Sequence, residues 1–255
     1  MKDRIFIVSC YFDGSNYSIF NCTNSIIKYY RNPKIVVVDS DSPDKSYFKL
    51  LEKKKISILD IKNRNYDTGA YWKAYEKFNN FKFYYFLQDS LILKKNLSKF
   101  EVFDFTSIRY FISSDIVGGF KFKKTKNTII SKLVNLFKSE NKIHDLYGFD
   151  NSEQLEWAVN KLKNTDYFFP KTWISLFGPV FICKPFVLNK LIAKKFNLIL
   201  PENKLQQMAM ERLFGIALQQ EGVNVTNSIQ GNHFKTKLSN DYIEKKFYNR
   251  KKIKF

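Results

Sequence analysis

The feature that most constrains the fold of this chain is a regular alternation of apolar runs and helix-like segments over residues 1–95. The apolar runs are nearly continuous, which is typical of strands buried on both faces. These predicted strands are residues 5–11, 34–38, 56–61 and 83–93. The predicted helices between them are residues 25–30, 46–55 and 68–79. Strands and helices in alternation predict an α/β fold in which helices cover both faces of a central sheet.

The second half of the chain is less regular. Its apolar periodicity predicts helices at residues 128–138, 152–163, 185–195 and 205–220, with one strand at residues 180–183. We therefore expect a single domain with a helical C-terminal portion. Its expected parts are a first half at 1–95, a second half at 96–240 and a basic tail at 241–255.

The composition excludes several classes of protein. The three cysteines and two histidines form neither a metal-ligand spacing nor a disulfide framework. No stretch approaches the roughly 18 apolar residues that span a bilayer. The first apolar run ends at Asp13 without a small-residue cleavage site, so we interpret it as a strand of a cytoplasmic protein rather than as a signal peptide.

The formal net charge of +19 favours a polyanionic partner, such as nucleic acid, an anionic membrane or a phosphate-rich substrate. An A/T-rich coding sequence would also enrich Lys together with Asn, Ile, Phe and Tyr, so the charge alone does not identify the partner. Basic residues concentrate in the segment FKFKKTK at 120–126 and in the tail. We expect these two segments to attract an anionic membrane surface, the alternative being that they are simply solvated.

Polar residues cluster at the carboxyl ends of the four predicted strands of the first half, in the fourth strand after its apolar part. They are Ser9 and Tyr11, then Asp39 and Asp41, then the loop from Asn63 to Asp67, and finally Asp89. In open α/β sheets ligands bind beyond the carboxyl ends of the strands. The sequence therefore predicts a binding site rich in carboxylates at that edge.

Three stretches in this order resemble GT-A glycosyltransferases, in particular bacterial polysaccharide enzymes of the rhamnan-synthesis type. They are VVVDSDSPDKS at 36–46, NRNYDTGAYWKAYEKF at 63–78 and YYFLQDSLIL at 84–93. The resemblance covers residues 1–95 and implies a GT-A-like (Rossmann-like) mixed sheet flanked by helices. It also implies a nucleotide-sugar donor and a glycan or lipid-linked acceptor.

The resemblance further implies roles for individual residues. The implied nucleotide-sugar-binding residues are Ser9, Tyr11, Asp39, Asp41, Asp67, Tyr71, Gln88 and Lys235. Asp67 or its neighbour Thr68 has an alternative role as the cap of the following helix.

Asp89 stands where this fold binds the Mn²⁺ or Mg²⁺ ion that bridges the donor's phosphates. Gln88 replaces the usual first acid of that motif, so dependence on a metal stays open. In the alternative interpretation, Asp89 is a strand-end residue bonded to neighbouring backbone.

The stretch GNHFKTK at 231–237 resembles a C-terminal segment of glycogenin-like glycosyltransferases. This implies that His233 is a second metal ligand and that Lys235 or Lys237 contacts phosphate. We expect Glu211 to be the base that deprotonates the acceptor, the alternative being a pair with Arg212 or exposure to solvent. Trp173, Phe177 and Gly178 are expected either to form the acceptor's binding floor or to belong to the core.

Two other functions compete with this hypothesis. A nucleic-acid-binding protein would use the positive charge and the many aromatic residues, but it would leave the strand-end carboxylates unexplained. A non-catalytic relative that binds a sugar nucleotide without transfer is the second alternative, because the acidic motif is incomplete.

Overall fold

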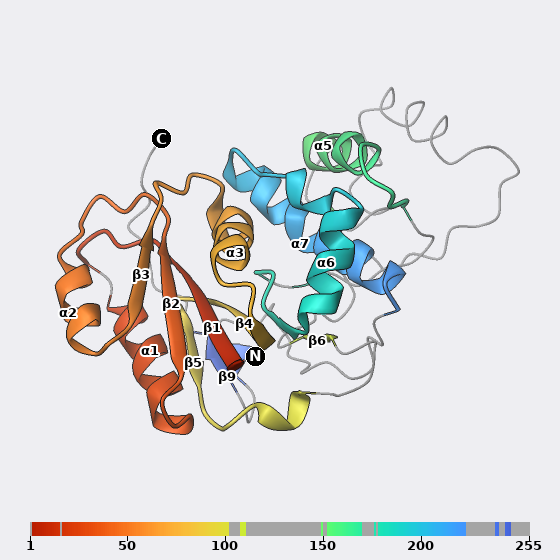
Figure 1. Cartoon of the computed structure of the whole chain (residues 1–255). Coiled ribbons are helices and arrows are strands. Elements are labelled where there is room, and N and C mark those ends of the chain that lie inside the picture. Colours follow the sequence, from red (N-terminus) through yellow and green to blue (C-terminus); the bar gives the residue numbers. More distant parts are fainter. Residues whose placement is uncertain are drawn as a thin grey trace, which may run out of the picture.

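A computed structural model describes most of the chain (Figure 1). The described residues are 2–15, 17–101, 108–110, 149, 152–169, 176, 178–222, 238–239 and 243–245. The predicted helix at 128–138, the segment at 120–126 and most of the predicted tail lie outside these ranges.

A six-stranded mixed sheet forms the centre of the described structure, in the order β3-β2-β1-β4-β7-β6. The strands are β1 (Lys2–Cys10), β2 (Lys34–Asp39), β3 (Ser57–Asp60), β4 (Phe81–Gln88), β6 (Ile108–Tyr110) and β7 (Phe181–Cys183). The first four strands run parallel to one another, and β7 runs antiparallel to both β4 and β6. This sheet confirms the expected GT-A-like α/β arrangement.

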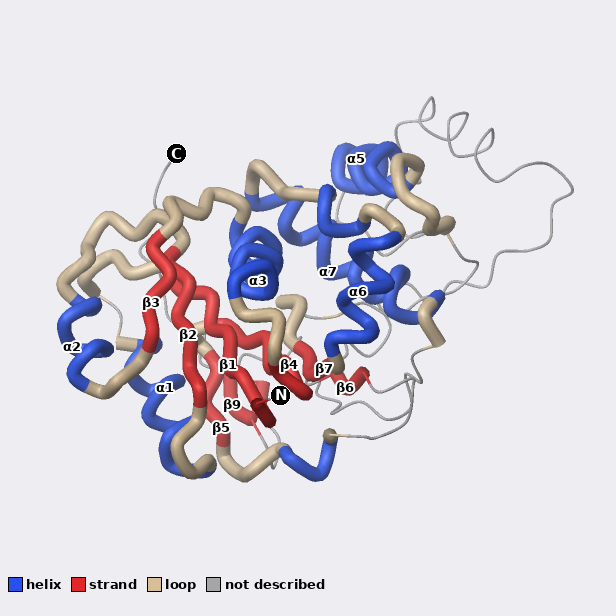
Figure 2. Tube along the Cα trace, viewed as in Figure 1, coloured by secondary structure: helices blue, strands red, loops and turns tan. Residues whose placement is uncertain are grey.

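Helices cover both faces of the sheet (Figure 2). The helices of the described ranges are α1 (Ser18–Tyr29), α2 (Tyr47–Lys53), α3 (Tyr66–Lys77), α5 (Ser152–Leu162), α6 (Pro185–Ala193) and α7 (Lys204–Gln220), and α5 packs on α7. Two short 3-10 helices, η1 (Ser98–Phe100) and η2 (Phe196–Leu198), complete the helical elements of the described ranges. The expected helical C-terminal portion is therefore confirmed by α5, α6 and α7.

Successive residues of β1 face opposite sides, as the two-residue period of a strand requires. Ile5 and Ile7 belong to a hydrophobic cluster with side chains of α3, α5, α6 and α7. Phe6 and Val8 belong to a second cluster with side chains of α1 and α2. Because both faces of the strand are buried, the run had to be apolar throughout rather than alternating.

The single strand predicted at 83–93 is wrong. β4 ends at Gln88, a turn at Asp89 and Ser90 follows, and β5 (Leu91–Leu93) joins a second sheet in the order β5-β9-β8. The other strands of that sheet are β8 (Leu238–Ser239) and β9 (Ile243–Lys245). The Gln-Asp-Ser triplet thus divides the apolar run into two strands.

The helix predicted at 25–30 is longer than expected, because α1 already begins at Ser18. Polar residues in its first half conceal its apolar periodicity. The Thr23 hydroxyl donates to the Ile19 carbonyl at 2.8 Å and the Ser25 hydroxyl to the Cys22 carbonyl at 2.6 Å. These bonds allow both hydroxyls to be buried within a helix.

Within the ranges that the structure describes, no helix has both the length and the apolar character needed to cross a bilayer. The residues 243–245, which fall in the predicted basic tail, form β9 against β5, and Ile243 is fully buried there. This part of the predicted tail therefore belongs to the folded structure.

Candidate functional site

The direction of the chain crossovers changes between β1 and β4. From β1 the chain passes through α1 to β2, and through α2 to β3, on one face of the sheet. It then returns through α3, on the other face, to β4 at the opposite side of β1 (Figure 1). In doubly wound sheets ligands bind at such a switch point, outside the carboxyl ends of the strands. Ser9 and Gln88 are paired across the two strands at this end.

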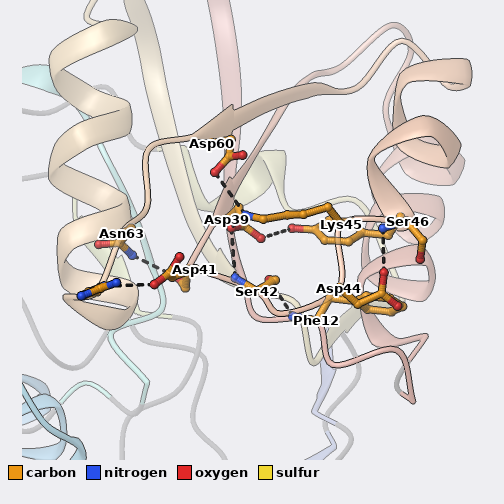
Figure 3. A network of polar contacts seen from close by, with 12 residues as sticks. Phe12, Asp39, Asp41, Ser42, Asp44, Lys45, Ser46, Asp60 and Asn63 are labelled. Atoms are coloured by element: carbon orange, nitrogen blue, oxygen red, sulfur yellow. Dashed lines mark hydrogen bonds and ion pairs between the residues drawn. The ribbon is translucent and has the colours of Figure 1, made fainter.

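Asp39, at the end of β2, is the centre of a buried polar network (Figure 3). Its carboxylate accepts hydrogen bonds from the Tyr47 hydroxyl at 2.6 Å, from the Ser42 backbone N–H at 3.1 Å and from the Lys45 ammonium group. Lys45 also reaches the carboxylate of Asp60 at 3.2 Å. The carboxylate of Asp39, which is predicted to bind the nucleotide, is therefore fixed by residues that directly follow β2.

These contacts determine the ionisation of Asp39. Burial alone would raise the pKa of its carboxyl group, but the hydrogen bonds from Lys45, Ser42 and Tyr47 together lower it below the ordinary value of 3.8. A lowered pKa in the folded state means that ionised Asp39 stabilises the fold. This stabilisation is complete above about pH 4 and is lost as the pH falls through the lowered pKa.

Replacing Asp39 with Asn is expected to reduce the free energy of unfolding near pH 7 by about 1–3 kcal/mol, because the ammonium of Lys45 loses its buried partner. Urea unfolding from pH 7 to pH 3 should show the wild-type and variant stabilities converging below pH 4. Asp41→Asn is the matched control. The Asp41–Arg64 ion pair is exposed and Asn tolerates the positive φ of 54° at this position, so this change should have little effect. Equal stability of wild type and Asp39→Asn at pH 7 would contradict the assigned network.

A second set of contacts ties the ends of β1 and β2 to the start of α3. The hydroxyl oxygens of Ser9 and Ser40 lie 3.4 Å apart, and the Asn63 amide donates to Ser40 at 3.1 Å and to the Tyr66 carbonyl at 2.7 Å. The side chains of Asp41 and Arg64 form an ion pair at 3.0 Å. Two of the predicted residues, Ser9 and Asp41, are thereby linked to the loop that precedes α3.

Gly69 allows the loop that precedes α3 to pack closely on that helix. A Cβ atom at this position would lie 2.4 Å from Oδ1 of Asn63 and 2.6 Å from Cβ of Asn65. Any larger residue would push the loop away from the helix. Close packing at this edge of the sheet therefore requires glycine at the last position of the NRNYDTG stretch.

The end of β4 contacts both α3 and the second half of the chain through Gln88. The Gln88 amide donates to Oδ2 of Asp67 at 2.5 Å. A Cβ atom on Gly178, whose φ is +61°, would lie 2.6–2.8 Å from the Gln88 amide group. Three predicted residues, Asp67, Gln88 and Gly178, are thus brought together. Asp67 does not cap α3: the N-cap position is Asn65, which makes no capping bond with its side chain.

Asp89 lies in the turn after β4 and is 7% exposed. Its backbone N–H donates to the Ser9 carbonyl at 3.0 Å, so the backbone of the turn is fixed to β1. The side chain raises the pKa of two neighbouring buried thiols, Cys10 and Cys22, although burial raises both more strongly. Asp89 therefore lies at the switch point, at the end of the strand rather than within it.

The described residues contain no cluster of three or more His, Cys, Asp or Glu side chains able to hold a metal ion. Mg²⁺ often needs only one or two carboxylates, because substrate phosphates and water complete its shell. Asp89 fits that limited role, while His233, the other predicted ligand, lies outside the described residues.

Glu211, the predicted base, lies in α7 and is linked to this edge through its backbone. Its carbonyl accepts a hydrogen bond from the Leu176 N–H at 2.8 Å, and Leu176 is two residues from Gly178. Its carboxylate lies 3.5 Å from Arg212, which was the predicted alternative. The catalytic role of Glu211 stays a prediction.

The remaining predicted residues contribute less to the described geometry. Tyr71 is buried in α3, and Tyr11 follows β1 with a half-buried side chain. Trp173, Phe177, His233 and Lys235 lie outside the described residues. Three further residues of this edge, Lys45, Ser42 and Ser40, were not predicted, although a polar loop directly after a buried strand was a signal for them.

Comparison with known proteins finds only distant similarity to this chain. No protein-family model and no curated protein matches the chain. Among solved structures, S. aureus TarS is 16% identical with a TM-score of 0.47, covering 97% of this chain and 37% of that chain. TarS 1–349 in complex with UDP is 14% identical with a TM-score of 0.45, covering 95% of this chain and 60% of that chain.

The apo-form glycosyltransferase GlyE of Streptococcus pneumoniae TIGR4 is 17% identical with a TM-score of 0.32, covering 56% of this chain and 40% of that chain. The chain thus spans less than two thirds of the length of each of these three structures.

Proposed function

We propose that this protein is a glycosyltransferase that moves a sugar from a nucleotide-sugar donor to a glycan or lipid-linked acceptor. The observation that carries the proposal is the convergence of Asp39, Asp67, Gln88 and Asp89 at one edge of the sheet, around its switch point. A sugar nucleotide offers many hydroxyl groups, and carboxylate and amide groups are suited to accept and donate hydrogen bonds to them.

The two sides of this edge have different proposed roles. The β2 side, with Asp39, Asp41 and Ser9, would bind the nucleoside, whose ribose hydroxyls and base N–H groups are donors. The β4 side, with Asp67, Gln88 and Asp89, would bind the diphosphate and the sugar. Gly178 and the chain leading to α7 would border the acceptor, because Gly178 contacts Gln88 directly.

A divalent ion, Mn²⁺ or Mg²⁺, is proposed as an accessory of the donor rather than as a permanently bound cofactor. When bound, it would neutralise charge on the leaving nucleoside diphosphate. Asp89, with His233 from outside the described residues, is the expected protein ligand. The lysines Lys235 and Lys237 are the expected additional source of positive charge next to the phosphates.

An acceptor anchored at an anionic membrane would suit the charge of +19, since basic segments gain about 1 kcal/mol per Lys or Arg near such a surface. Nucleic acid is the less favoured partner. The carboxylates of Asp39, Asp67 and Asp89 lie at the proposed binding edge, and their negative charge disfavours a phosphate backbone there.

Thermal unfolding with UDP, GDP, CDP and dTDP, each with and without Mn²⁺, tests this proposal. One nucleotide at about 100 times its Kd should add roughly 2.7 kcal/mol of stability, which is visible as a rise in Tm. If that rise requires Mn²⁺ and disappears in Asp89→Asn, the metal role is supported as well. No rise with any nucleotide, combined with tight and salt-sensitive binding of RNA, would favour the nucleic-acid alternative instead.

A further inference from the structure

The Tyr71 hydroxyl is buried without a hydrogen-bond partner. The residue is 1% exposed, and the hydroxyl is one of three buried side-chain polar atoms without a partner in the described part of the chain. The other two, on Trp72 and Gln207, belong to α3 and to its contact with α7. Leaving a buried hydroxyl unpaired destabilises a protein, so we expect this hydroxyl to have a partner in another state of the protein.

The geometry of α3 directs this hydroxyl toward the proposed donor site. Asp67 and Tyr71 are four residues apart and share one face of the helix, and helical side chains lean toward the N-terminus. The Tyr71 ring packs on Phe86 of β4 at 4.8 Å between ring centroids and on Phe181 of β7 at 6.3 Å. The hydroxyl therefore lies beneath the carboxyl ends of the strands.

Its charged surroundings agree with that location. The pKa of Tyr71 is raised well above its ordinary value, first by burial and then by the negative charges of Asp67 and Asp89. Two carboxylates of the proposed donor site are thus near a hydrogen-bond donor that has no acceptor. Asp67 lies on α3, about one turn before Tyr71, and its Oδ2 accepts a hydrogen bond from the half-buried Gln88 amide.

We propose that Tyr71 is a positioning residue of the donor site, whose hydroxyl donates a hydrogen bond to Asp67 only when a nucleotide sugar is bound. The donor's sugar hydroxyls or phosphate oxygens recruit the Gln88 amide, which leaves Asp67. The Tyr71 hydroxyl then replaces Gln88 and holds the carboxylate in place. Because the hydroxyl is shielded from solvent, Tyr71 acts through Asp67 and does not touch the ligand. This inference rests on the proposed function.

Tyr71→Phe tests it, because the change removes only the hydroxyl. Without ligand, Tm should stay equal or rise, since an unpaired buried group is removed. The Kd of the nucleotide sugar that binds wild type should rise about tenfold, the loss of one hydrogen bond to a charged acceptor. The probes are UDP-N-acetylglucosamine, UDP-glucose, GDP-mannose and dTDP-rhamnose, measured by calorimetry.

Tyr84→Phe is the matched control. Tyr84 is fully buried, belongs to the same hydrophobic cluster as Tyr71, and donates its hydroxyl hydrogen to the Phe78 carbonyl at 2.8 Å, at the other end of the sheet. Its removal should lower Tm and leave the Kd unchanged. Tyr71→Phe is therefore expected to weaken binding without lowering stability, and Tyr84→Phe to lower stability without weakening binding. A merely structural role of Tyr71 would not produce this difference.

A double-mutant cycle identifies the partner. In an Asp67→Ala background, Tyr71→Phe should no longer change the Kd. The inference is overturned if Tyr71→Phe lowers Tm as Tyr84→Phe does, or if wild type and Tyr71→Phe bind the same sugar nucleotide equally. If no nucleotide sugar binds wild type, the proposed function fails and this inference fails with it, a result distinct from the previous two.

Discussion

Asp89→Asn is expected to lower kcat/KM for sugar transfer at least a hundredfold, the usual scale for removing one charged group from the stabilisation of a transition state. Asn keeps the shape of the side chain but removes its negative charge. The bond between the N–H of residue 89 and the Ser9 carbonyl involves only backbone, so the turn after β4 should be retained. The measurement is the initial rate of nucleoside diphosphate release.

The matched control is Asp3→Asn, the same change at the amino end of β1. Asp3 is exposed and forms an ion pair with Lys82 at 3.2 Å, on the edge of the sheet opposite to the proposed site. This variant should transfer sugar at nearly the wild-type rate. Unchanged turnover by Asp89→Asn would instead assign Asp89 the purely structural role of a strand-end residue.

Gly178→Ala is expected to have the second-largest effect, because it disturbs both the backbone and Gln88. A φ of +61° costs a non-glycine residue about 1–2 kcal/mol, and the new Cβ would displace the Gln88 side chain. The displaced Gln88 amide would no longer be positioned to bind the donor, so the activity should fall about tenfold or more. Urea unfolding and initial rates measure the two effects separately.

Gly222→Ala is the control for the cost of a positive φ at a non-glycine residue. Gly222 has a φ of +82° just beyond the end of α7, so its replacement should cost a similar amount of stability. Full activity of Gly222→Ala alongside reduced activity of Gly178→Ala would locate the effect at Gln88. Equal activity of the two variants would contradict a role for the Gly178–Gln88 contact in the site.

Local sequence pattern predicted the elements of the first half well. The uninterrupted apolar run at 34–38 and the polar residues directly after it predicted both the burial of β2 and the location of Asp39 at a strand end. The polar interruption at Gln88 and Asp89 indicated the end of the apolar part of β4, although the predicted strand was wrongly continued to residue 93. Burial and turn residues are local properties, so they are visible in a single sequence.

Pairing over long sequence distances could not be predicted in this way. The antiparallel pairing of β7 with β4, and that of β9 with β5, depend on which edges the tertiary structure leaves open. The contacts of Lys45 with Asp39 and of Gln88 with Asp67 depend on side-chain geometry that no residue spacing determines. The resemblance indicated which residues to consider, whereas the structure shows which of the described ones meet.

The most direct test of the proposed function is the release of nucleoside diphosphate from the four nucleotide sugars named above, in the presence of a glycan or lipid-linked acceptor fraction and Mn²⁺. The proposed function predicts that wild-type protein releases the diphosphate from one of them, with the sugar recovered on the acceptor, and that Asp89→Asn does so at least a hundredfold more slowly. Binding of a sugar nucleotide without any turnover would contradict a transferase and indicate the non-catalytic relative instead.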